Sequence, residues 1–399
     1  MTKSKLFTKS FILIFFANCF VSLTFYLLMT TLAAYAIRQF QASESMAGLA
    51  SGIFIIGALF ARLFTGKYME VIGRKKVIYG SLVLFLIAAL LYFPVNHLNL
   101  LLFVRFIQGV AFGASTTAMI TAVMDMIPNS RRGEGTGYFA LSTTIATAVG
   151  PFLGLFLTQY ADYHMIFVTC TAFSVLSLLI ILFAEIPEAD ITDEQLESMK
   201  KGVRLQDFLE KRAVPISVIL IIMGISYSSI VSFINLYAVE IQLEEAASLF
   251  FLVYAVFLFI SRPIAGRLQD NKGDNFIMYP AILLFSLCLL LIGVAQNGFI
   301  LLLAGILLAA GYGTIVSAAQ AIAIKESPKH RVGLATSTFF IFMDGGMGLG
   351  PFIIGMIVPY VGYRGIYLTL AVVVFLSLTL YYFLHGKKVT ARKHDKQVA

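Results

Sequence analysis

The sequence predicts an all-α membrane protein with twelve transmembrane helices in two pseudo-symmetric six-helix bundles. Three observations lead to this expectation: an apolar composition, twelve apolar runs of membrane-spanning length, and an internal repeat at an offset of 200 residues. Of the 399 residues, 59% are hydrophobic and only 13% are charged. A soluble domain of this size has too little polar surface to cover so much apolar side chain, so lipid must solvate most of the chain.

The apolar runs fall into two sets of six, each run long enough to cross a bilayer. We expect spans at about 11–37, 46–65, 77–94, 99–123, 134–158 and 164–184, then at 214–239, 247–265, 276–294, 299–323, 333–358 and 364–384. Residues 185–213 form the only long polar segment between the sets. The sequence therefore predicts an N-terminal bundle (1–184), a cytoplasmic linker (185–213), a C-terminal bundle (214–384) and a basic cytoplasmic tail (385–399).

The positive charges indicate the orientation of the chain in the membrane. The net charge of +8 would by itself also suit a nucleic-acid binder. With the N-terminus inside, however, 24 of the 29 Lys and Arg lie in the N-terminus, the even-numbered loops and the C-terminal tail. This asymmetry is the positive-inside pattern. We expect a multi-pass protein of the cell membrane with both termini cytoplasmic, surrounded by lipid and without a nucleic-acid partner.

The two halves repeat each other in glycines, prolines and loop charges as well as in hydropathy. At an offset of 200 the matching positions are Gly113 and Gly313, Pro128 and Pro328, Arg131 and Arg331, Gly133 and Gly333, and Gly150-Pro151-Phe152 and Gly350-Pro351-Phe352. Duplicated six-span halves are a known plan of transporters, with the substrate site between the halves. A channel or a receptor has no comparable need for this symmetry.

A polar island separates two apolar runs in each half, at 66–76 and 266–274. We expect both islands to be loops in which Gly66 and Gly73 permit tight turns. Their acids, Glu70 and Asp270, are expected at the N-terminus of a helix in the opposite half, near Gly333 and Gly133, where the helix dipole favours negative charge.

Two charges exchange places between the halves. Arg74 and Asp125 in the first half correspond to Asp274 and Lys325 in the second. An exchange of this kind is expected where the two positions touch, so the sequence predicts Arg74–Asp125 and Asp274–Lys325 ion pairs on the cytoplasmic face. Isolated surface pairs contribute little to stability, and we expect these pairs to bias the opening of an inner gate instead. The alternative, loops that only fix orientation, does not explain the exchanged signs.

At this point the whole chain resembles the major facilitator superfamily and, within it, the twelve-span drug:proton antiporters. The matching residues are Gly66, Glu70, Gly73, Arg74 and Lys75 in the first island, Arg105, Gln108, Gly109 and Gly113 in the fourth span, and Gly137, Gly150, Pro151 and Gly154 in the fifth. Val71 stands where a base is usual, and Ala146 and Leu155 replace two glycines of the antiporter signature. The resemblance implies a transporter that works by alternating access.

Asp344 is the one acid deep inside an apolar span, and Arg105 is a base inside another. An ionised carboxylate there is costly, so such a group tends to be functional. We expect Asp344 to couple transport to protons; the alternative is a structural carboxyl bonded to a neighbouring helix or to the backbone near Gly345. The repeat counterpart of Arg105 is Gly305, so symmetry does not require the charge. The resemblance implies that Arg105 tunes proton affinity or binds substrate, and its alternative is snorkelling to the outer interface.

The paired motifs Gly150-Pro151 and Gly350-Pro351 lie in the middle of spans five and eleven. Proline removes a backbone hydrogen bond and kinks a helix, and small residues at a spacing of four permit close helix crossing. We expect these motifs to form a flexible interface between the halves. Ordinary membrane-helix glycines are the alternative at any single position.

In the family's fold, polar residues of spans one, four, seven and ten line the cavity. The candidates are Asn18, Tyr26, Gln108, Tyr227, Asn235, Tyr312 and Gln320. Each of them, taken singly, is more often an interhelical hydrogen bond than a ligand contact. The chain has no metal-ligand spacing, nucleophile triad or phosphate loop, so we expect neither an enzyme nor a cofactor.

The resulting hypothesis is a monomeric, proton-driven exporter of small amphipathic molecules, whose partners are that substrate and protons. One alternative is a transporter of a single metabolite, such as a sugar, an amino acid or a metallophore, in either direction. The other is a membrane sensor or lipid-handling protein that uses the same scaffold without transport.

Overall fold

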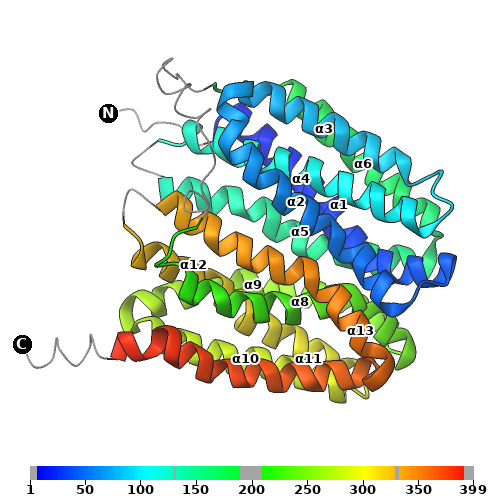
Figure 1. The fold of residues 1–399 in the computed structure, drawn as a ribbon, viewed down its shortest axis with the longest axis vertical. Helices are drawn as coiled ribbons and strands as arrows, with labels where there is room; N and C mark the ends of the chain where they lie inside the picture. The colour runs from blue at the N-terminus through cyan, green and yellow to red at the C-terminus, as the bar shows by residue number, and fades with distance from the viewer. Residues whose placement is uncertain (1–6, 129–131, 189–208, 329–331, 391–399) are drawn as a thin grey trace, which may run out of the picture. The chain divides into compact units, whose positions relative to one another are not determined.

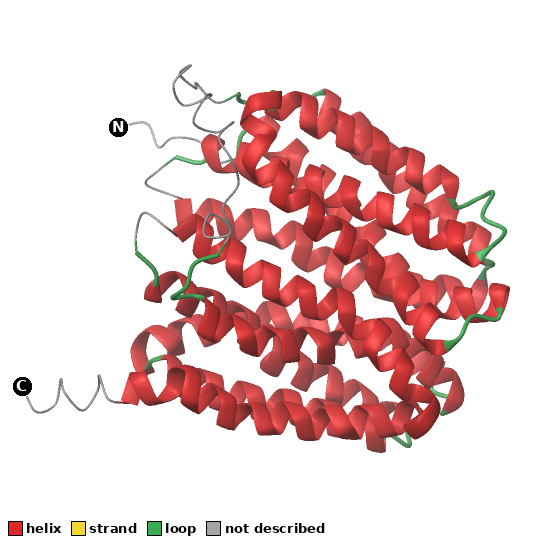
Figure 2. Ribbon diagram, in the orientation of Figure 1, coloured by secondary structure: helices red, strands yellow, loops and turns green. Residues whose placement is uncertain are grey.

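Helices account for nearly all of the described chain (Figure 2). The structure, a computed structural model, describes residues 7–128, 132–188, 209–328 and 332–390. The first six helices are α1 (Lys9–Phe40), α2 (Glu44–Ile72), α3 (Arg74–Leu91), α4 (Leu98–Met126), α5 (Arg132–Tyr160) and α6 (Tyr163–Leu182). Then follow α8 (Val214–Glu240), α9 (Glu244–Lys272), α10 (Asp274–Val294), α11 (Gly298–Leu308), η3 (Ala309–Gly313), α12 (Thr314–Glu326), α13 (Val332–Tyr381) and η5 (Tyr382–Gly386).

The described helices agree with the predicted twelve spans. Ten of them are long and apolar enough to cross a membrane, with α11, η3 and α12 forming one continuous span. Helix α3 is not among the ten because Arg74, Lys75 and Lys76 occupy its first turn. Helix α13 contains two spans, because Gly362 interrupts it with φ 70°. Adding α3 and dividing α13 at Gly362 gives the expected number, and the protein is an all-α membrane protein.

The chain forms two compact units, one of Met1–Ala42 with Leu49–Val203 and one of Ser43–Gly48 with Arg204–Ala399. In the first unit, α1 packs against α5 and α6, and α3 packs against α4 and α6. In the second unit, α13 packs against α8 and α10, and α9 against α11. Figure 1 colours the helices of the first unit from blue to green and α8 to α13 of the second from green to red.

The two polar islands are helical, which corrects the expectation of loops. Helix α2 continues through the island to Ile72 and α9 continues to Lys272, so that one residue separates each from the next helix. That residue is Gly73 with φ 99° or Gly273 with φ 89°. Only glycine adopts this backbone region without strain. The polar residues of the islands therefore do not end these helices. Gly73 ends α2, and Gly273 ends α9.

The α11–η3–α12 span differs from its counterpart α4 at its centre. Both run for 29 residues, but Ala309–Gly313 forms a π-helical turn, whereas α4 is α-helical from end to end. A side chain at Gly311 would place its Cβ 2.5 Å from the backbone nitrogen of Phe285 in α10. The wide turn therefore lies where two helix backbones meet, and π turns within α-helices are frequent at functional sites.

Glycines of α4 allow it to approach α2 closely. An ideal Cβ at Gly109 would lie 2.0 Å from the carbonyl oxygen of Phe54, and one at Gly113 would lie 2.3 Å from that of Ala58. These are backbone atoms, which cannot move aside as a flexible side chain can. Close contact between small residues is the main way in which helices associate where lipid surrounds them.

We predict that Gly109→Ala destabilises the protein by about 1–3 kcal/mol, because the added methyl group overpacks the α2–α4 contact. Thermal unfolding in detergent measures the effect as a lower apparent Tm. Gly80→Ala is the matched control, because nothing lies within 4 Å of a Cβ at this helical position. Equal apparent Tm values for the two variants would contradict the assigned packing.

Candidate functional site

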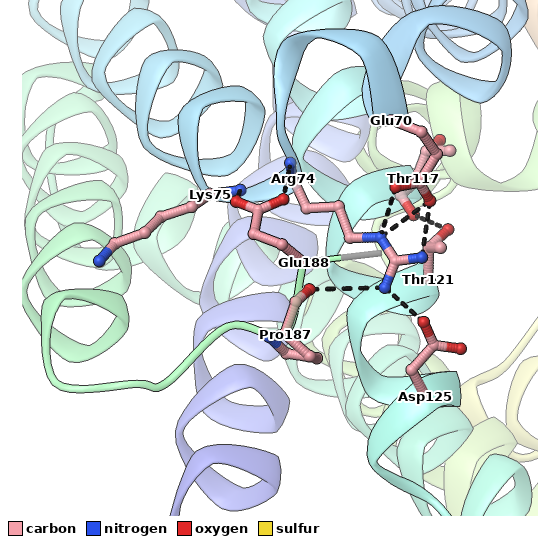
Figure 3. A network of polar contacts seen from close by, with 8 residues as sticks. All are labelled: Glu70, Arg74, Lys75, Thr117, Thr121, Asp125, Pro187 and Glu188. Atoms are coloured by element: carbon pink, nitrogen blue, oxygen red, sulfur yellow. Dashed lines mark hydrogen bonds and ion pairs between the residues drawn. The ribbon is translucent and has the colours of Figure 1, made fainter. Parts of the chain in front are cut away.

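Arg74 is the centre of a polar network at one end of the first unit (Figure 3). It is the first residue of α3 and only 5% exposed. Its Nε donates to Glu70 Oε1 at 2.8 Å, and its NH2 nitrogen lies 2.6 Å from the same oxygen. Its NH1 nitrogen pairs with Asp125 of α4 and donates to the carbonyl oxygen of Pro187 at 3.4 Å. The predicted Arg74–Asp125 ion pair is therefore present, and Glu70 is a further partner from α2.

Glu188 caps the first turn of α3 in the same network. Its two carboxylate oxygens accept from the backbone N–H groups of Arg74 at 2.7 Å and of Lys75 at 3.0 Å. Figure 3 shows Glu188 turned toward these two nitrogens. A carboxylate is favourable there because a helix N-terminus has unpaired N–H groups and a positive dipole end. The segment after α6 is thereby fixed to the α2–α3 corner.

Asp274 is the centre of an equivalent network of opposite sign in the second unit. It is the first residue of α10 and only 3% exposed. Its carboxylate accepts from Lys325 Nζ at 3.2 Å and from Gln269 Nε2 at 3.1 Å, and lies 3.5 Å from His385 Nε2. The predicted Asp274–Lys325 ion pair is present. We call the clusters around Arg74 and Asp274 the first and the second hub.

The exchange of signs between the hubs extends beyond the predicted pairs. A cation is surrounded by Glu70, Asp125 and a carbonyl oxygen in the first hub, and an anion by Gln269, Lys325 and His385 in the second. Sequence reasoning placed His385 in a tail, whereas η5 continues α13 and brings it to Asp274. The expected capping by Glu70 and Asp270 stays a prediction, and the side chain of Asp270 lies outside the described part of the structure.

Arg105 is completely buried inside the first unit. Its guanidinium carbon lies 4.2 Å from the ring centroid of Phe54, and NH1 donates to Gln108 Oε1 at 3.0 Å. Tyr92 donates to the same oxygen at 2.7 Å. The Nε and NH2 nitrogens of Arg105 have no hydrogen-bond partner among the described residues. Full burial rules out snorkelling to the interface, and a buried cation with two unpaired nitrogens is costly to retain.

Asp344 lies in α13 of the second unit, between two residues that contact α8 closely. It is 8% exposed. An ideal Cβ at Gly224 would lie 2.7 Å from the carbonyl oxygen of Met343, and one at Gly346 would lie 2.5 Å from that of Ile221. These contacts place the Asp344 backbone beside a close α8–α13 crossing, and an ionised carboxyl group buried at this depth of a span is costly.

The predicted cavity residues fall into three kinds of environment. Asn18 of α1 donates to Ser142 of α5 at 2.8 Å, and Gln108 belongs to the Arg105 group. Tyr227 stacks on Tyr312 with ring centroids 4.1 Å apart. Within their helices Asn235 is buried, and Tyr26 and Gln320 are half-buried. A cavity role for these residues stays a prediction.

Each unit contains a trio of aromatic rings, which the sequence analysis did not predict as groups. In the first, Phe25 stacks on Phe54 at 4.9 Å and both pack on Phe112. In the second, Tyr227 contacts Tyr312 with ring centroids 4.1 Å apart and Tyr254 with centroids 6.4 Å apart. Two members of each trio are repeat counterparts, because Phe54 corresponds to Tyr254 and Phe112 to Tyr312. Comparing aromatic positions across the repeat would have found them. The first trio thus consists only of phenylalanine rings, and the second consists only of tyrosine rings, which carry hydroxyl groups.

The Gly-Pro motifs lie inside helices as predicted, but their closest contacts are within their own unit. A Cβ at Gly150 would lie 2.7 Å from Tyr26 Cβ in α1, and one at Gly350 would lie 2.2 Å from Ser228 Oγ in α8. Pro151 and Pro351 lie inside α5 and α13. The glycines permit α1–α5 and α8–α13 crossings. An ideal Cβ at Gly48 of α2, in the N-terminal half of the sequence, would lie 1.9 Å from the carbonyl oxygen of Pro351. A flexible interface between the halves stays a prediction. A small-residue pattern indicates close approach, but it does not identify the neighbour.

We predict that Lys325→Asp lowers the apparent Tm, because it puts a second carboxylate beside the buried Asp274. We expect a loss of about 1–3 kcal/mol, less than for a fully buried pair because Lys325 is largely exposed. Adding Asp274→Lys should restore part of the stability. The recovery is incomplete because His385 and Gln269 then face a cation. A double variant no more stable than the weaker single variant would contradict the contact.

The sequence is similar to those of known membrane transporters. A sequence model of the Major Facilitator Superfamily matches residues 14–295 and 244–398. The chain is 24% identical to a staphylopine export protein of Staphylococcus aureus, over 88% of this chain and 89% of the relative. It is 28% identical to multidrug resistance protein 3 of Bacillus subtilis, over 32% and 25% of the two chains.

The fold is also found among solved structures. A POT family transporter in complex with a thioalcohol-conjugated peptide superposes with a TM-score of 0.78, at 14% identity, over 95% of this chain and 96% of that one. Such low identity establishes a common fold and nothing about the substrate. Because the family's sequence model covers nearly the whole chain, the protein belongs to the major facilitator superfamily of transporters.

Proposed function

We propose that this transporter is a proton-driven exporter of small amphipathic molecules that works by alternating access. The observation that carries the proposal is the buried Asp344 in α13. Burial disfavours the charged form of a carboxyl group, so such a group binds a proton in one conformation and releases it when its surroundings become more polar. The 8% exposure of Asp344 supports this role, because a change of conformation that opens the site to water would favour the charged form.

Arg105 is proposed to assist the coupling from the first unit. It is a permanent cation, and no carboxylate pairs with it among the described residues. Since Gly305 occupies its repeat position, the duplicated scaffold does not need the charge. An unpaired buried cation raises the local potential and favours the approach of an anionic or deprotonated group.

The two hubs are proposed to be latches of the inner gate. Arg74 and Asp274 each join three segments of their unit: the end of the preceding helix, the end of α4 or α12, and the segment that follows α6 or α13. A cluster of this kind can bias two conformations that differ by a few kcal/mol.

The substrate is proposed to contact the predicted cavity residues, among them Asn18 and Gln108 in the first unit and Tyr227 and Tyr312 in the second. An aromatic surface with a few hydrogen-bonding groups suits a small amphipathic molecule. The partial match to a multidrug resistance protein supports a broad substrate range.

Asp344→Asn tests the proposal in proteoliposomes with an imposed pH gradient. We expect uphill transport to be lost, because the amide cannot exchange a proton, while downhill exchange of substrate continues. Asp162→Asn is the matched control, since Asp162 is an exposed acid just outside α6. Uphill transport by the Asp344→Asn variant would contradict the proposed proton-coupling role of this residue.

Export of one metabolite is a second candidate. The staphylopine exporter matches along nearly its whole length, whereas the multidrug relative matches over a quarter of its own. A substrate panel in the same vesicles separates the two, because a single-metabolite exporter responds to one compound and its close analogues. A protein that binds substrate yet moves neither substrate nor protons would instead be a sensor.

A further inference from the structure

Each unit has an apolar groove on its outer surface, and the two grooves are repeat counterparts. The first has a volume of about 450 Å³ and lies between α2, α3 and α4; the second has about 430 Å³ and lies between α9, α10 and the α11–η3–α12 span. Most positions that line the first groove have a counterpart in the second at an offset of 200, among them Phe64 with Ile264 and Gly80 with Pro280. Phe64 and Ile264 are 49% and 54% exposed, so the grooves face lipid rather than the interior of a unit.

One lysine stands at the mouth of each groove, and its position differs between the two. In the first unit, positions 72 and 76 are Ile72 and Lys76, and both line the groove. In the second unit, Lys272 corresponds to Ile72, and Phe276, which lines the groove, corresponds to Lys76. The Lys272 ammonium lies 4.5 Å from the centroid of the Phe276 ring. Each mouth therefore combines one cation with one apolar side chain, in exchanged order.

The mouths lie at the end of each unit that carries its hub, where α2 meets α3 and α9 meets α10. By the positive-inside pattern this is the expected cytoplasmic end, where the leaflet is rich in anionic lipid. An apolar groove below a lysine matches the two parts of such a lipid. A free phosphate would gain nothing from the apolar walls.

We propose that both grooves are binding sites for an anionic phospholipid, with an acyl chain in the groove and the headgroup phosphate on Lys76 or Lys272. The site is independent of the transported substrate and of Asp344. It fixes the α2–α3 and α9–α10 corners to the cytoplasmic leaflet through the lipid. These corners carry Arg74 and Asp274, so the lipid composition of the membrane affects the contacts within both hubs.

Tryptophan fluorescence tests the proposal directly, because the natural chain contains no tryptophan. Phe64→Trp and Ile264→Trp each place one reporter in a groove, and Phe103→Trp places one on exposed lipid-facing surface outside both grooves. The full-length variants are reconstituted in vesicles, and quenching by brominated phosphatidylglycerol is compared with quenching by brominated phosphatidylcholine. We expect phosphatidylglycerol to be favoured about fivefold at both groove reporters and not at the Phe103→Trp reporter.

Crossed lysine variants give matched controls within one molecule. Lys76→Gln should remove the preference at the Phe64→Trp reporter and leave the Ile264→Trp reporter unchanged, and Lys272→Gln should do the reverse. Sodium phosphate at constant ionic strength should not compete. The proposal is overturned if both lipids quench all three reporters alike, or if the preference survives loss of the local lysine. Because the readout is lipid contact, neither result depends on whether the protein pumps protons.

Discussion

Polar groups inside the hydrocarbon of a membrane need partners from the protein itself, and this constraint organises the structure. Backbone groups meet it by forming helices throughout the spans. Side chains meet it by bonding between helices: Ser177 of α6 donates to the carbonyl oxygen of Ala17 in α1, Tyr237 of α8 to that of Ile292 in α10, and Ser286 of α10 to that of Ala371 in α13. Glycines bring the helices close enough for such bonds, so packing and polar satisfaction depend on the same close crossings.

The buried charged residues fall into two groups. At the ends of the units, Arg74 and Asp274 are almost buried but each contacts an oppositely charged residue and further polar groups, and each directly follows a glycine with positive φ. Within the spans, Arg105 and Asp344 are buried at positions where the repeat has Gly305 and Thr144. The end charges thus follow the duplicated scaffold, whereas the interior charges break its symmetry. The duplication accounts for Arg74 and Asp274, and we propose a functional role for Arg105 and Asp344.

The spans and both ion pairs were predictable, because hydropathy marks lipid-facing helices and the repeat shows which charges change together. Other features left no such trace. Glu188 reaches α3 from a polar segment without a distinctive pattern, and His385 reaches Asp274 because α13 continues into η5. The π turn at Ala309–Gly313 adds no residue relative to α4, so spacing did not reveal it. Small residues at Gly150 and Gly350 predicted close contact, but their neighbours depend on tertiary packing.

We propose that binding of substrate and protonation of Asp344 are coupled through one conformational equilibrium. The most direct measurement is the proton balance on adding a transported substrate to purified protein in weakly buffered detergent, followed with a pH indicator. The account predicts that wild-type protein releases protons on binding and that Asp344→Asn binds the same substrate without release. Equal proton release from both proteins would contradict it.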